Sequence, residues 1–93
     1  MDSNTVRQLE REFDSTLINH LISMGFLSFS LIDKGNFCYS EERDETHHST
    51  YYVVSLELEG KRYSQLFVLK DGTTEVRPVS NIIIETATTK KND

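Results

Sequence analysis

The sequence is poor in the residues that cross-link, interrupt or anchor a chain. It has one cysteine, one proline, four glycines and no tryptophan. A single cysteine excludes a disulfide within the chain, and no apolar run approaches the roughly 20 residues of a membrane span. Residues 1–5 lack the basic and apolar regions of a signal peptide. We therefore expect a cytoplasmic protein in which Cys38 is a buried or half-buried small hydrophobe.

Basic residues are outnumbered. Ten lysines and arginines against fifteen acids give a net charge of −5. Binding to nucleic acid without sequence preference depends on basic side chains that release phosphate counterions, and anionic membranes attract basic segments. We expect neither a direct nucleic-acid partner nor a membrane partner. The apolar fraction of 37%, with four tyrosines and five phenylalanines, is enough for one small core. A single domain over residues 1–93 is predicted.

The first periodic pattern in the chain is helical. Apolar side chains recur every three or four residues at Val6, Leu9, Phe13, Leu17, Leu21 and Met24. This spacing predicts a helix over 5–24 whose core face is that stripe. Thr5 with Gln8 has the form of a capping box, and Gly25 suits the left-handed residue after a helix. Ile18 and Ile22 lie outside the stripe. They are either covered by another part of the chain or exposed as a contact patch.

After the helix, the pattern alternates with a period of two, which is typical of strands. Strands are predicted at about 27–32, 37–40, 50–59, 62–70, 73–79 and 82–87, with a disordered tail over 88–93. In the third of these strands, Tyr52, Val54, Leu56 and Leu58 should face the core. The order of elements predicts an α+β fold, with one N-terminal helix packed on a mainly antiparallel five- to six-stranded sheet.

A helix followed by an antiparallel meander resembles the layout of the cystatin-like and monellin-like folds. The resemblance covers the order of elements and no motif. The cystatin inhibitory motif Gln-x-Val-x-Gly does not occur, and Gln65-Leu66-Phe67-Val68-Leu69 does not fit it. The resemblance therefore implies an architecture and carries no function.

One cluster of residues could support chemistry. It is the segment after Cys38, with Glu41, Glu42, Asp44, Glu45, His47 and His48. Carboxylates and histidines bind zinc, but this spacing fits no metal signature, and Asp44 with His47 is the only plausible local pair. We interpret 41–48 as a solvated, charged hairpin loop, and His20 as a residue at the edge of the core. No nucleophile elbow or phosphate loop occurs, so we expect no metal, no cofactor and no enzymatic activity.

Binding remains as the leading interpretation. We predict a small acidic, non-enzymatic module that docks on a protein with a basic surface, as an inhibitor, an immunity- or antitoxin-like factor or a phage-encoded protein. Tyrosine is enriched at interfaces, and acidic loops steer basic partners. The predicted contact residues are Glu41, Glu42, Asp44, Glu45, His47, His48, Tyr51 and Val53, with Ile18 and Ile22 as a further patch. Three alternatives stay open: a homodimer or other homo-oligomeric subunit, a DNA-mimic inhibitor, and a small-ligand-binding or enzymatic domain near His20.

Overall fold

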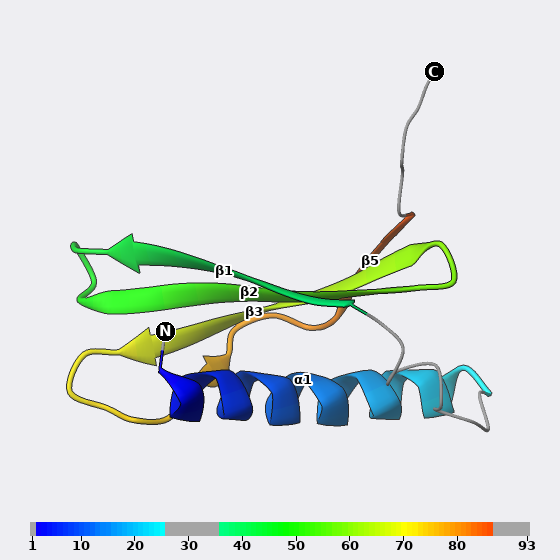
Figure 1. Ribbon diagram of the computed structural model, residues 1–93, viewed down its shortest axis with the longest axis horizontal. Helices are drawn as coiled ribbons and strands as arrows, with labels where there is room; N and C mark the ends of the chain where they lie inside the picture. The colour runs from blue at the N-terminus through cyan, green and yellow to red at the C-terminus, as the bar shows by residue number, and fades with distance from the viewer. Residues whose placement is uncertain (1, 26–35, 87–93) are drawn as a thin grey trace, which may run out of the picture.

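The computed structural model describes residues 2–25 and 36–86. Its elements, in chain order, are α1 (Ser3–Ser23), β1 (Asn36–Asp44), β2 (Ser49–Leu58), β3 (Lys61–Lys70), β4 (Arg77–Pro78) and β5 (Ile83–Thr86). The helix lies along one face of the sheet (Figure 1). This arrangement confirms the predicted α+β class with one N-terminal helix on an antiparallel sheet. The predicted strand at 27–32 and the predicted tail at 88–93 lie outside the described residues.

The helix begins earlier than the sequence pattern indicated. Asp2 is the N-cap, and its Oδ1 accepts a hydrogen bond of 2.9 Å from the backbone N–H of Thr5. The prediction of a capping box from Thr5 and Gln8 is therefore wrong, because a carboxylate three residues earlier already caps the positive end of the helix dipole. That hydrogen bond lowers the pKa of Asp2. At the other end, Gly25 has φ +90°, as predicted.

The core side of the helix follows a stripe of every fourth residue. Leu9, Phe13, Leu17 and Leu21 are buried as predicted, and Thr5 is buried in place of Val6 at the start of the stripe. Met24 is 52% exposed, contrary to the prediction. It caps the helix with φ −96° and ψ 4°, so helical spacing no longer sets its direction.

Three long strands form an antiparallel meander. β1 pairs with β2 from Asn36↔Glu57 to Asp44↔Ser49, and β2 pairs with β3 along its whole length. The prediction that β1 ends near residue 40 and is followed by a loop over 41–48 is therefore wrong. An edge strand tolerates charged side chains, so the run of charges at 41–44 continues the strand. The turn is limited to residues 45–48.

The last two strands share the second edge of β3. β4 pairs at Phe67↔Pro78 and Val68↔Arg77, and β5 pairs along Lys61–Ser64. Between them, Leu66 donates its N–H to Ser80 Oγ (3.0 Å) and accepts from the N–H of Val79 (2.8 Å). The predicted strand at 73–79 thus shrinks to two residues, whereas the final strand predicted at 82–87 is confirmed as β5.

The core lies between α1 and the inner face of the sheet. Tyr52, Val54 and Leu56 are buried there as predicted, and Leu58 packs partly buried against them. The ring of Phe13 meets that of Phe37 edge-on, with centroids 6.0 Å apart. Each strand alternates, so the residues between these face the opposite, open face of the sheet.

Candidate functional site

The strand register brings three of the predicted contact residues together on the open face. Glu42 on β1 is directly opposite Tyr51 on β2, and Ser40 is opposite Val53. Glu42 is exposed, Tyr51 is half-buried, and Val53 is 41% exposed. Paired residues share a face of the sheet, so Glu42, Tyr51 and Val53 form one surface.

Glu41 is separated from this surface because the side chains of a strand alternate. It pairs with Tyr52, which is buried in the core on the helix side. Burial raises the pKa of the Tyr52 phenol, and the Glu41 carboxylate raises it further. Tyr39 also faces the helix side. Its pKa is raised mainly by burial and further by the Glu10 carboxylate. Glu41 therefore faces a buried phenol instead of the predicted contact surface.

The end of β1 is held by an arginine, Arg43, whose role no local sequence pattern indicates. Arg43 binds Asp71 through two contacts of 2.6 and 2.7 Å, and its Nε donates to Glu45 Oε1 at 2.8 Å. Asp71 lies in the turn after β3, 28 residues further along the chain. The Arg43 guanidinium lowers the pKa of Asp71. Predicting this contact requires the strand register, which local composition does not reveal.

Asp44 and His47 form the local pair that their spacing suggested, but the pair has a structural role. Asp44 Oδ1 accepts from the backbone N–H groups of Thr46 (3.0 Å) and His47 (3.1 Å), and Oδ2 lies 2.8 Å from His47 Nδ1. These contacts, led by that with the His47 ring, lower the pKa of Asp44. His48 follows with φ 49°. Within residues 2–25 and 36–86, no cluster of three or more potential ligands could hold a metal ion.

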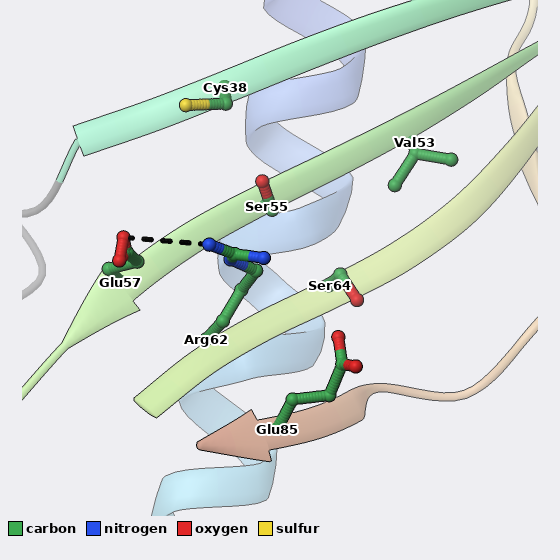
Figure 2. Close-up of a pocket in the computed structure, with 7 residues that line it drawn as sticks. All are labelled: Cys38, Val53, Ser55, Glu57, Arg62, Ser64 and Glu85. Carbon is green, nitrogen blue, oxygen red and sulfur yellow. Dashed lines mark ion pairs between the residues drawn. The ribbon is translucent and has the colours of Figure 1, made fainter. Parts of the chain in front are cut away.

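A shallow cleft lies on the open face toward the far ends of these strands. Its volume is about 350 Å³, and its lining residues are Cys38, Val53, Ser55, Glu57, Arg62, Ser64 and Glu85. Figure 2 shows these side chains on the side of the sheet away from the helix, with Glu57 and Arg62 paired at 3.9 Å. Cys38 is exposed here, so the expectation of a buried or half-buried thiol is wrong. Its position in β1 directs it to the open face.

The helix residues predicted as candidate contact or ligand residues lie in the helix layer and not on the open face of the sheet. Ile18 packs against the core, whereas Ile22 is 55% exposed. His20 is half-buried and its ring meets that of Tyr63 edge-on, with centroids 6.3 Å apart. Tyr63 faces the helix, so these residues lie on the side of the sheet opposite Tyr51 and Val53. The two predicted patches do not form one surface.

Comparison with known proteins gives no relative: no family model matches the sequence, and neither the curated proteins nor the solved structures contain a significant match. In the described part of the chain, no helix has the length and apolar character needed to cross a membrane.

Proposed function

We propose that this chain is a small, acidic, non-enzymatic cytoplasmic protein that docks on another protein through the open face of its sheet. The supporting observation is a group of apolar side chains on that face, which we call the open-face patch: Tyr51, Val53 and Ile83. Val53 is 41% exposed and Ile83 is 50% exposed. Exposed apolar groups rimmed by charge are typical of a protein contact surface.

The charges beside the patch favour a basic partner. Glu42 borders Tyr51, and Asp44 and Glu45 continue the acidic edge into the turn. Arg43, at the end of β1, is engaged by Asp71 and Glu45, whereas Lys70 lies across β2 from Asp44, paired with Ser49. With a net charge of −5, the chain would steer a partner that carries lysine or arginine around an apolar anchor.

The mixed charge of the open face disfavours the DNA-mimic alternative. Such an inhibitor needs a continuous acidic surface that imitates phosphates. Arg62 lies in the open-face cleft, and Lys70 and Arg77 line a second hollow beside Val68. An inhibitor, an immunity-like factor or a phage-encoded regulator that docks on a protein would use this surface without copying DNA.

The test is capture of a partner from lysate of the cells that make the protein, using the immobilised chain. Glu42→Lys reverses an exposed charge on the open face, and Glu12→Lys makes the same change on the exposed side of α1. We expect a stoichiometric protein that is retained by the wild type and by Glu12→Lys at low salt. It should be lost with Glu42→Lys and at high salt.

Asp44 and Glu45 are unsuitable for this test because their carboxylates hold the turn and Arg43. Retention of the same protein by Glu42→Lys and by the wild type would contradict docking at this surface. Absence of any retained protein at either salt concentration would contradict the proposed function itself.

A further inference from the structure

We infer that the open face of the sheet binds the open face of a second copy, about a twofold axis that runs parallel to the strands between β2 and β3. This homodimer rests on the proposed function, because both use the open face as a contact surface. It adds that a second copy of the chain covers that surface when the docked protein is absent. The order of residues across the face selects this occupant.

Rows of side chains cross the open face at right angles to the strands, because paired residues share a face. The register of β1 to β4 defines the row that we call the Tyr51 row: Glu42, Tyr51, Val68 and Arg77. The neighbouring row, which we call the Val53 row, consists of Ser40, Val53 and Leu66. The β2 and β3 members of both rows are apolar, and Val53 is 41% exposed. The two rows therefore form an apolar band across the middle of the face.

The two ends of the Tyr51 row carry opposite charges. Glu42 at the β1 end and Arg77 at the β4 end are both exposed. Three strand spacings separate them, roughly 14 Å between their backbones. Neither side chain forms an ion pair with a described residue. Each charge is therefore available to an opposite charge on a molecule that covers the face.

A twofold axis parallel to the strands turns each row back on itself. β2 of the second copy then lies over β3, and β1 lies over β4. In the Tyr51 row, Glu42 faces Arg77 of the second copy, and symmetry repeats this contact. Sheets that pack face to face lie about 10 Å apart and cross at up to about 30°, so the match is closest beside the axis. The apolar members of both rows lie there, and the long charged side chains lie further out.

A second pair of charges selects the same orientation. Glu57 and Arg62, which are paired at 3.9 Å between β2 and β3, come to lie over Arg62 and Glu57 of the second copy. An axis at right angles to the strands, through the Val53 row, would instead place Lys70 over Arg62. It would also place Tyr51 over Ser55. Like charges that face each other disfavour an interface, so the axis parallel to the strands is preferred.

One corner of this interface brings two acids toward each other, Asp44 of one copy and Glu75 of the other. The Asp44 carboxylate already accepts hydrogen bonds from the N–H groups of Thr46 and His47. Lys70 lines a hollow together with Glu75. Both acids therefore have donors or a cation beside them, which reduces the repulsion at this corner.

Reversal of each charge at the ends of the Tyr51 row tests the arrangement. In a dimer of Glu42→Lys, the introduced lysine faces Arg77 of the other copy, twice by symmetry. In a dimer of Arg77→Glu, the introduced glutamate likewise faces Glu42. We expect each variant alone to self-associate about tenfold or more weakly than the wild type. Glu12→Lys makes the same change of net charge on the exposed side of α1 and should associate like the wild type.

An equimolar mixture of the two variants separates a lost contact from a lost fold. In the mixed dimer, the introduced lysine faces the introduced glutamate, and Arg77 of one variant faces Glu42 of the other. Association in the mixture should therefore return to within a few-fold of the wild type. Sedimentation equilibrium measures the mass across a concentration series, and circular dichroism checks that each variant is folded.

We expect the wild type to shift from monomer to dimer as its concentration rises. A monomeric wild type at every concentration would overturn the homodimer. Mixed variants that associate as weakly as the separate variants would overturn the arrangement about this axis. The two proposals fail separately. A monomeric wild type that still retains a different protein from lysate contradicts the homodimer alone, whereas a dimer that retains no protein contradicts the proposed docking alone.

Discussion

Arg43 and Asp71 form a two-point ion pair that joins the first strand to the turn after the third. Nη1 lies 2.6 Å from Oδ1 and Nη2 lies 2.7 Å from Oδ2. The backbone N–H of Asp71 also donates to the carbonyl oxygen of His48 at 2.9 Å. β2 lies between β1 and β3 in the sheet. Through these contacts, Asp71 links the turn after β3 both to β1 and to the turn between β1 and β2.

Replacing Arg43 by lysine should lower the Tm by a few degrees. An ammonium group cannot reproduce the planar fork that meets both carboxylate oxygens, and exposed pairs contribute modestly. Thermal unfolding followed by circular dichroism measures the change. Arg11→Lys on the exposed side of α1 is the control, and it should leave the Tm unchanged. Equal Tm values for both variants would mean that the two-point pair adds nothing to stability.

Acidification should destabilise the fold through Asp44 and Asp71. Hydrogen bonds and neighbouring charges lower the pKa of both carboxyls below 3.8. A lowered pKa in the folded state means that the stabilisation is present above the ordinary pKa of aspartate. It is lost as the pH falls through the folded-state value. The Tm should therefore fall below about pH 4.

Asp44→Asn should reduce the slope of this acid loss, because the amide keeps an acceptor for the turn but has no proton to bind. Glu12→Gln, an exposed carboxylate on α1, should leave the slope as in the wild type. The check is the Tm measured from neutral pH to pH 3, which must show a shallower fall for Asp44→Asn. A fall as steep as that of the wild type would contradict the role given to Asp44.

Gln8→Ala should lower the free energy of unfolding by about 1–2 kcal/mol, the usual range for two hydrogen bonds. The Gln8 amide donates to the carbonyl oxygen of Thr74 (2.6 Å) and accepts from the N–H of Val76 (3.1 Å). It thereby fixes the chain between β3 and β4 against the helix. Urea unfolding measures the loss, with Asn19→Ala as an exposed amide on the same helix for comparison. A loss no larger than that of Asn19→Ala would show that Gln8 does not hold this segment.

Leu17→Ala should cost about 2–5 kcal/mol of unfolding free energy, since the side chain is fully buried between helix and sheet and leaves a cavity. Ile22→Ala, five residues further along at a position 55% exposed, should cost far less. Comparable losses in urea unfolding would place the core face of α1 elsewhere.

The elements that could be predicted from the sequence are those whose signal is local. The stripe at Leu9, Phe13, Leu17 and Leu21 requires only helical spacing, and the alternation in 50–59 requires only the period of a strand. The extent of β1 could not be predicted in this way. Its charged half has the composition of a loop, and it becomes strand because 49–52 of β2 pair with it. Gln8 was misassigned for a similar reason, since its partners lie 66 and 68 residues away.

The candidate site also combines residues with a local sequence signal and residues whose roles depend on strand pairing. Glu42, Tyr51 and Val53 were chosen for their residue types, and the register brings them together. Glu41 was chosen with them, but alternation places it on the helix side. The ion pair between Arg43 and Asp71 could not be predicted without knowing which strands are neighbours. Residue types predicted a contact surface. Strand pairing then determined which of the predicted residues lie on it.

The most direct test of the proposed docking compares two exposed apolar positions on opposite layers. Val53→Asp changes the open-face patch, and Ile22→Asp makes the same kind of change on the helix. After the captured partner has been purified, its affinity for each variant can be measured by calorimetry. We expect Val53→Asp to weaken binding by about tenfold or more, the effect of losing one well-buried contact side chain. Ile22→Asp should bind like the wild type. Unchanged affinity for a folded Val53→Asp variant, or a loss confined to Ile22→Asp, would contradict docking through the open face.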